Sequence, residues 1–437
     1  MDAGRRSISP ALVKLAVLGS LVAACVSSAP TSPTTAPAVS LPAGAAQATP
    51  RPTLTPEPTP TSSPGPTWQV SSIPPMFSGR QSVPVALTVG DQQLVAVGGR
   101  TFRDVNAPSG GTASAWRSAD GRTWEPATAG PDLAVGDRIP LSGPEAGFVD
   151  VAWGRAGFVA VGYALEPSAV VGAIWRSTDG RDWIRVASPL WALARPTAVT
   201  WNGARYVVVG VVEGKAEPRA AVWLSSDGLS WRRVADGPAF DIGGYIDTGE
   251  YHSWGGPKDV TAAESGELYA VGETCAGTSS LSDRAPCRPL VWHSADGASW
   301  TRTEPGAAAA RSSLSSVATA QGRVVVVGGP QDGNVDRPAR VLVGGETGWR
   351  LVELPGVPRL VRVIPWRSGF LAASIAGGQL SLWTSQAGIT WTQVPDLPQP
   401  PGASSGSVDL ASVNDRLVLV GWTEAEAPGG FAITWSP

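Results

Sequence analysis

One segment of the sequence brings carboxylates and aromatic rings close enough together to do chemistry. Between Asp236 and Pro257 the chain holds three further acidic residues, two tyrosines, one of only two histidines, and a tryptophan. These residues are Asp241, Tyr245, Asp247, Glu250, Tyr251, His252 and Trp254. Aromatic rings offer flat apolar faces to a ligand, and two carboxylates across one pocket can cleave a glycosidic bond. The segment is a candidate binding loop; the alternative is a polar loop anchored by its aromatic residues.

A second set of charged residues recurs at one position of a repeating pattern. Apolar runs end in Val-Gly at several places, such as Val161-Gly162, and a short apolar segment begins about 11 residues earlier. Aligning these segments makes seven residues equivalent: Ala86, Asp150, Ala198, Asp259, Ser316, Arg362 and Asp409. The charged members could converge on a ligand. In the structural alternative, the aspartates bond neighbouring amides and Arg362 forms an ion pair with Asp409.

The composition excludes several other classes of function. Charged residues make up 16% of the chain and the net charge is -3, so the protein lacks the strongly basic field that holds nucleic acid. With two histidines and three cysteines, the chain cannot build a His-rich or Cys-based metal site. We therefore predict no metal, no cofactor and no nucleic-acid partner.

The elements that would position these candidates come from an internal repeat. Five segments share a pattern that starts and ends in tryptophan and encloses Ser-x-Asp-Gly, although the fifth has Ala387 in place of Asp. They run from 116 to 124, 175 to 183, 223 to 231, 292 to 300 and 383 to 391. A degenerate sixth copy ends at Trp349. Asp-Gly between two strands indicates a tight turn, because glycine accepts positive φ.

Each repeat predicts four antiparallel strands, and four-stranded units repeated radially make a β-propeller. We expect an all-β, seven-bladed propeller spanning residues 67 to 437. The chain ends after the third strand of the seventh repeat, at Phe431 to Trp435, whereas Trp68 lies in a segment that resembles a fourth strand. The N-terminal strand should therefore complete the last blade and remove an open edge.

The repeat also accounts for most of the 19 tryptophans. Those expected in third strands are Trp116, Trp175, Trp223, Trp292, Trp383 and Trp435. Those expected in fourth strands are Trp68, Trp124, Trp183, Trp231, Trp300, Trp349 and Trp391. We interpret both sets as packing between blades.

The Ser-x-Asp-Gly-x-x-Trp unit resembles the Asp-box, or BNR repeat, of bacterial sialidases and related propellers. The family pattern has one more residue between Asp and Gly. The resemblance implies that Asp120, Asp179, Asp227 and Asp296 form structural turns on the face opposite the ligand site. Arg138-Ile-Pro also resembles the sialidase arginine motif, but it follows an Asp-box here, and sialidase domains have six blades.

The first residues predict an export signal. Arg5 and Arg6 precede an apolar run from Ala11 to Ala24, which is typical of a secretory signal peptide and short for a membrane span. The run ends Val-Ala-Ala-Cys25, which resembles the lipobox of bacterial lipoproteins, where the cysteine is lipidated and becomes the mature N-terminus. The alternative is ordinary secretory cleavage next to a chance cysteine. We predict a signal peptide at 1 to 24 and an extracytoplasmic, membrane-anchored protein.

The segment from 25 to 66 is expected to be a disordered tether. Residues 26 to 66 contain 11 Pro, 8 Thr and 6 Ser, which leaves too little apolar surface to fold. Farther along, Cys275 and Cys287 bracket a loop rich in small residues, so in an exported protein they predict a local disulfide, with two reduced thiols as the alternative.

These features together predict a cell-surface propeller that binds a ligand or protein, or acts as a scaffold, without catalysis. The alternative is a sialidase-like glycan hydrolase or lyase that uses loop carboxylates. The expected partners are the membrane, through the lipid, and a glycan or protein ligand.

Overall fold

The computed structural model describes most of the chain after residue 66. The described ranges are 67–76, 82–99, 113–133, 146–166, 169–213, 218–242, 246–247, 250–251, 255–274, 287–306, 309–331, 334, 336–345, 348–376, 378–400, 408–422 and 429–437. All of them lie in one compact unit, Ser63–Pro437. In these ranges no helix is long and apolar enough to cross a membrane.

The described residues form antiparallel sheets in which strands adjacent in sequence pair. One four-stranded sheet contains β10 (Ala194–Trp201), β11 (Tyr206–Val212), β12 (Arg219–Ser225) and β13 (Arg232–Arg233). The next contains β16 (Gly256–Ala262), β17 (Leu268–Thr274), β18 (Arg288–Ser294) and β19 (Thr301–Thr303). A third contains β20 (Ser312–Ala320), β21 (Arg323–Pro330), β22 (Ala339–Gly345) and β23 (Gly348–Leu354). A fourth contains β24 (Arg362–Trp366), β25 (Gly369–Ala376), β26 (Gln379–Ser385) and β27 (Thr392–Gln393).

An eight-stranded sheet consists of two groups of four joined at one point. The first group is β2 (Val83–Gly90), β3 (Gln93–Gly99), β4 (Ser114–Ser118) and β5 (Glu125–Pro126). The second is β6 (Ala146–Gly154), β7 (Gly157–Glu166), β8 (Ala169–Ser177) and β9 (Ile184–Arg185). Gly99 of β3 pairs with Gly147 of β6 and joins the groups. Two 3-10 helices, η1 (Pro189–Trp191) and η2 (Pro238–Phe240), lie in connections that lead to β10 and β16.

The N-terminal strand closes the last sheet. Its order is β1 (Thr67–Ile73), β30 (Gly430–Ser436), β29 (Arg416–Trp422) and β28 (Val408–Val413). Trp68 lies opposite Trp435, and the pairing continues to Ile73 opposite Gly430. The prediction that the segment around Trp68 supplies the missing strand is confirmed, because β1 occupies the edge that β30 would otherwise expose.

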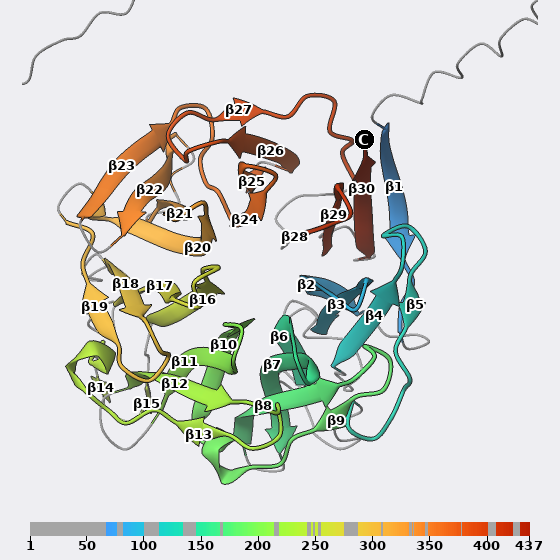
Figure 1. The fold of residues 1–437 in the computed structure, drawn as a ribbon, viewed down its shortest axis with the longest axis vertical. Coiled ribbons are helices and arrows are strands. Elements are labelled where there is room, and N and C mark those ends of the chain that lie inside the picture. The colour runs from blue at the N-terminus through green and yellow to red at the C-terminus, as the bar shows by residue number, and fades with distance from the viewer. Residues whose placement is uncertain are drawn as a thin grey trace, which may run out of the picture. The chain divides into compact units, whose positions relative to one another are not determined.

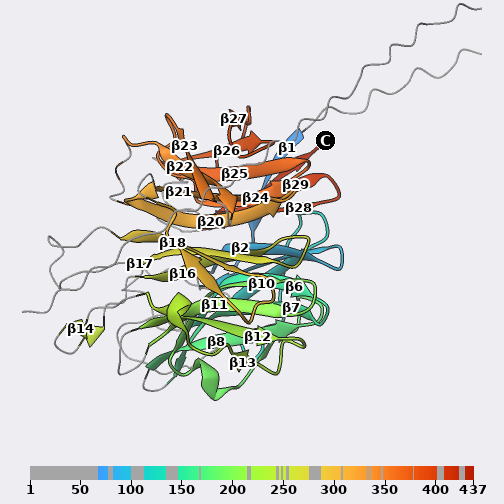
Figure 2. The same cartoon turned by 60° about the vertical axis from the view of Figure 1, so that its left-hand side comes forward.

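The sheets are arranged around a central axis (Figure 1). The innermost strand of each four-stranded group contacts the inner strand of the next, and β28 contacts β2, so the described inner strands form a closed ring. The turned view shows neighbouring sheets facing one another (Figure 2). This radial arrangement of twisted antiparallel sheets is the geometry of a β-propeller.

Packing between sheets explains the composition of the strands. Second strands such as β11 and β21 are apolar almost without interruption, because neighbouring sheets cover both of their faces. Third-strand tryptophans fill the same interfaces. Trp116, Trp175, Trp223 and Trp292 are at most 1% exposed, and the indole N–H of Trp175 donates to the carbonyl of Asp132 at 2.7 Å.

The other predicted set of tryptophans needs a correction. Trp68 and Trp349 do lie in outer strands, β1 and β23, but Trp124, Trp183, Trp231, Trp300 and Trp391 each lie one position before theirs. Each of these five indoles donates to the carbonyl of the glycine in its own turn, at 2.8 to 3.1 Å. That bond keeps the residue in the turn, and the outer strands that follow have only two or three residues.

The Ser-x-Asp-Gly turns share one hydrogen-bond pattern. In the first, Ser118 Oγ accepts from the amide of Gly121 at 2.8 Å, and Asp120 Oδ1 accepts from the amides of Arg122 and Thr123, both at 2.8 Å. Asp179, Asp227 and Asp296 accept the equivalent pairs of amides. These bonds lower the pKa of Asp227 to about 2, the bond from Ser230 being the largest cause. The contacts are those of a turn-forming residue.

The turn also packs against the preceding sheet. Gly121 has φ of 75°, and a Cβ placed there would lie 2.6 Å from the side chain of Val418 in β29. Glycine is therefore required both by the backbone and by the close approach.

Candidate functional site

The inner strands carry backbone amides without a partner in their own sheet, and the candidate charged residues accept hydrogen bonds from them. Each inner strand is a sheet edge, so alternate amides face the central axis without a partner from the ladder. The seven residues aligned from the sequence, which we call the inner ring, all occupy one register position. Each pairs with the equivalent residue of its second strand: Val97, Val161, Val209, Val271, Val327, Ala373 and Val420.

A β-bulge precedes the inner ring in five strands, where one residue is skipped in the pairing. The skipped residues are Val85, Val149, Thr197, Lys258 and Ser315. Bulges re-aim the residues that follow them, and here they precede the side chains that reach the axis.

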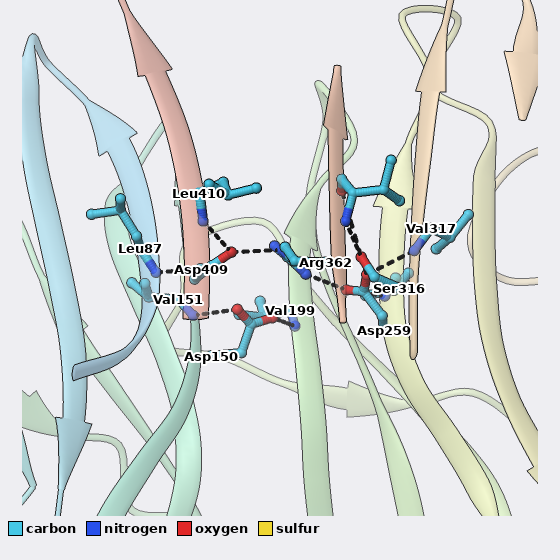
Figure 3. Close-up of polar contacts among 12 residues, drawn as sticks. Leu87, Asp150, Val151, Val199, Asp259, Ser316, Val317, Arg362, Asp409 and Leu410 are labelled. Atoms are coloured by element: carbon cyan, nitrogen blue, oxygen red, sulfur yellow. Dashed lines mark hydrogen bonds and ion pairs between the residues drawn. The ribbon is translucent and has the colours of Figure 1, made fainter. Parts of the chain in front are cut away.

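Each inner-ring position is followed by a residue whose backbone amide is accepted by a side chain of the ring. Three aspartates and one serine together accept all seven of these amides. Asp150 accepts from Val151 at 2.9 Å and from Val199 of the next inner strand at 2.7 Å (Figure 3). Asp259 and Asp409 repeat this arrangement at 2.7 to 2.9 Å. Asp259 accepts the amides of Val260 in its own strand and Val317 in the next inner strand. Asp409 accepts those of Leu410 in its own strand and Leu87 in the next inner strand. Ser316 Oγ accepts the last one, from Val363, at 3.2 Å.

These bonds tie neighbouring inner strands together. They connect β6 to β10, β16 to β20, β20 to β24 and β28 to β2. A related bond, from Thr197 Oγ1 to the carbonyl of Pro257 at 2.7 Å, connects β10 to β16. The inner ring therefore acts as a latch between sheets.

Arg362 supplies the positive charge at the centre of the latch. Its Nε lies 2.6 Å from Asp409 Oδ1, and its Nη1 lies 3.1 Å from Asp259 Oδ1. Figure 3 shows the guanidinium between the two carboxylates. The ion pair expected between Arg362 and Asp409 is present, and Asp259 is a second partner that the sequence did not predict.

The ring holds more negative than positive charge. Three carboxylates face one guanidinium, and among the described residues Asp150 has no ion-pair partner. Burial raises the pKa of Asp150 to about 7, although Arg362 opposes the shift. Burial also raises the pKa of Asp409. Burial alone would lower the pKa of Arg362, but the carboxylates, Asp409 first, raise it instead.

The inner ring separates two cavities on the axis. The smaller, about 130 Å³, is lined by the starts of inner strands, including Thr197, Lys258 and Ser315. The larger, about 230 Å³, is lined by the residues that follow the ring, including Trp153 and Trp201. Asp150, Asp259 and Arg362 border both.

The predicted binding loop is described only in part. Asp241 forms an ion pair with Arg219 at 2.7 Å. A short hairpin, β14 (Ile246–Asp247) and β15 (Glu250–Tyr251), places Asp247 opposite Glu250. Tyr245, His252 and Trp254 lie outside the described residues.

The remaining predicted sites stay predictions. Cys25 and Cys275 lie outside the described residues, and Cys287 directly precedes β18. Within the described ranges, no group of three or more His, Cys, Asp or Glu side chains could hold a metal ion.

The role of Ser316 was missed from the sequence. The repeat alignment places it in the ring, but its residue type does not predict that it accepts an amide and donates to Asp259 Oδ2 at 2.7 Å. Its position in the alignment was the available signal.

Several solved structures are similar to this one. A structure of YCF48 bound to a D1 peptide matches with a TM-score of 0.48 and 15% identity over 85% of this chain and 95% of that chain. The polysaccharide lyase Uly1 matches with a TM-score of 0.51 and 9% identity over 81% of this chain and 89% of that chain. Trypanosoma rangeli sialidase matches with a TM-score of 0.43 and 13% identity over 85% of this chain, which spans about 60% of the sialidase chain.

The sequence itself has no such match: no protein-family model and no curated protein sequence matches it. The ring of sheets and the similarity to the lyase structure together support a β-propeller fold.

Proposed function

We propose that this protein is a lipid-anchored, seven-bladed propeller that binds a ligand or protein partner, or acts as a scaffold, without catalysis. In this proposal each four-stranded group is one blade, with the eight-stranded sheet counted as two. Cys25 carries the lipid, residues 26 to 66 form the tether, and the loop between 236 and 257 contributes to the contact surface.

The observation that carries the non-enzymatic proposal is the state of the ring carboxylates. A glycosidase needs two carboxyl groups that reach the substrate, one as acid and the other as base or nucleophile. Both oxygens of Asp150, Asp259 and Asp409 accept backbone amides instead. A carboxylate that accepts hydrogen bonds from two amides, and in two of the three cases also pairs with an arginine, is poorly placed to transfer a proton to a ligand.

The loop between 236 and 257 is the better candidate for contact with a partner. Its hairpin pairs Asp247 directly with Glu250. The two acidic residues therefore share one register position in the connection that leads into the inner strand β16.

A binding screen tests this proposal. Purified protein is applied to a glycan array and used as bait against extracytoplasmic proteins of a bacterial host. The double variant Asp247→Asn with Glu250→Gln should lose at least about ten-fold in affinity for whatever binds. The matched control is Glu125→Gln with Glu304→Gln, two exposed acidic residues outside the loop that are paired with Arg117 and Arg288. Binding that survives the loop variant would remove the loop from the contact surface.

The anchor is tested separately. We expect Cys25→Ser to abolish incorporation of labelled palmitate and to release the protein from the membrane fraction. The control Ser27→Ala should leave both unchanged. Retained labelling of Cys25→Ser would contradict the proposed anchor.

A further inference from the structure

The larger cavity on the axis is not explained by the latch or by the predicted binding loop. It lies beyond the inner ring, away from the start of the inner strands, and is lined by residues of β2, β6, β10, β16, β20 and β24. Its volume is about 230 Å³, which is below the range typical of drug-sized ligand sites and suits a small molecule or one side chain.

Three hydroxyl groups line this cavity and have no hydrogen-bond partner in the described part of the chain. Thr88, Thr200 and Thr261 each lie two positions after an inner-ring residue and therefore project on the same side of their strands as that residue. Each is partly exposed to the cavity, and none makes a side-chain hydrogen bond within the described part of the chain. By contrast, the hydroxyl of Thr319, one position farther along β20, donates to the carbonyl of Ala262 at 3.2 Å.

The charge at the floor of the cavity favours a cation. The charged residues lining it are Asp150, Asp259 and Arg362. Arg362 is already paired with Asp259 and Asp409, and among the described residues the carboxylate of Asp150 forms no ion pair, although Arg362 is near enough to oppose the rise of its pKa. This field repels anions and attracts cations.

Two tryptophans complete the lining. Trp153 and Trp201 occupy the same position on neighbouring strands, three residues after Asp150 and Ala198 and about 10 Å along the strand. Because the offset is odd, their side chains lie on the opposite strand face from the ring residues and the threonines, packed against Gly90 and Gly154 of the preceding inner strands. Both are partly buried, and Trp201 packs on Tyr206 with ring centroids 4.8 Å apart. The indole surface that still borders the cavity is apolar and can cover an alkyl chain.

We propose that the larger cavity binds a small organic cation carrying a primary ammonium group. The three N–H donors of the ammonium find acceptors among the three threonine hydroxyls and the carboxylate of Asp150, and its carbon chain extends toward the apolar surface of Trp153 and Trp201. A free amine and a lysine side chain of a partner protein present the same chemistry. The site does not rest on the proposed function, because a scaffold or an enzyme could equally contain it.

The inner ring makes this binding depend on pH. An ammonium group needs Asp150 ionised, and the pKa of that carboxyl is about 7 in the folded protein. The charged groups that face it are Arg362, Asp259 and Asp409. Because the proton and the ammonium compete, affinity should rise as pH increases from 6 to 8.

Calorimetric titration of the full-length protein with n-butylammonium tests the site, with n-butanol as the neutral probe of equal size. We expect a dissociation constant of about 1 mM or lower at pH 8, weaker binding at pH 6, and none for n-butanol. Thr200→Val keeps the shape of threonine and should weaken binding about ten-fold. Thr319→Val, whose hydroxyl is already bonded, is the matched control and should have no effect.

The source of the ammonium is tested with two further probes. Binding of an acetylated lysine amide, but not of its Nε-acetyl form, would indicate that a partner's lysine side chain fits, whereas binding of n-butylammonium alone would indicate a free amine. The proposal fails if n-butylammonium shows no binding up to about 20 mM, if n-butanol binds equally well, or if Thr200→Val and Thr319→Val behave alike.

Discussion

The aspartates that the sequence indicates as ligand-binding candidates accept hydrogen bonds from backbone amides in the structure. Asp150, Asp259 and Asp409 were candidates for ligand binding because aspartates recur at a position near the axis. The alignment predicted that position correctly, and the register of every inner strand agrees with it. It could not show the bonds, because amides such as Val199 and Leu87 come from neighbouring repeats, as far as 322 residues away in the chain.

Arg362 should be the residue whose loss weakens the latch most. Arg362→Met leaves two carboxylates that are at most 7% exposed without their counter-charge. Breaking a buried ion pair from one side costs about 3 to 5 kcal/mol, so we expect the free energy of unfolding in urea at pH 7 to fall by that amount. The control Arg117→Met removes an exposed pair with Glu125 and should cost less than about 1 kcal/mol. Equal effects would contradict a latch centred on Arg362.

Asp150 should make stability depend on pH. Its pKa is raised from 3.8 in a free carboxyl to about 7 in the fold. Between these values the folded state binds a proton that the unfolded state has lost, so stability falls as pH rises from about 4 to about 7. The raised pKa of Asp409 acts in the same direction. Urea unfolding over this range should show a smaller fall for Asp150→Asn than for the wild type, and parallel curves would contradict the assignment.

At the scale of elements, the repeat predicted which strands exist but not how long they are. The turns and inner strands follow from local signals, namely Asp-Gly and apolar runs. The outer strands β5, β9, β13 and β27 have only two residues each, because the tryptophan before each one is held in its turn. The bulges before the inner ring were not predicted either, because the spacing between repeats does not show which residue of a strand is left unpaired.

The Ser385 to Trp391 turn offers a test by gain of stability. It keeps the bonds from Gly388 to Ser385 Oγ and from Trp391 to Gly388, but Ala387 replaces the aspartate. Ala387→Asp should provide the acceptor that Asp120 provides for Arg122 and Thr123, here for Ile389 and Thr390. We expect a gain of about 0.5 to 1.5 kcal/mol in the free energy of unfolding. Gln386→Asp, one position earlier, is the control, and a similar change in both variants would argue against the shared turn geometry.

At the scale of the whole molecule, the pairing of β1 with β30 joins the two ends of the propeller. A chain beginning at Ile73 lacks most of β1 and leaves β30 as an open edge. We expect its melting temperature to fall by at least about 5 °C and the protein to self-associate on size-exclusion chromatography. A chain beginning at Ser63 keeps β1 and should match the full-length protein. Equal melting temperatures for both truncations would contradict closure by β1.

The central claim is that this propeller binds without catalysis, and product analysis tests it most directly. The purified protein and its Asp247→Asn, Glu250→Gln variant are incubated with a panel of sialylated and uronic-acid glycans, and released sugars are measured by mass spectrometry. The proposed function predicts that neither protein releases sugar above the level without protein. Sugar released by the wild type and lost in the variant would contradict it and identify a glycan-active enzyme.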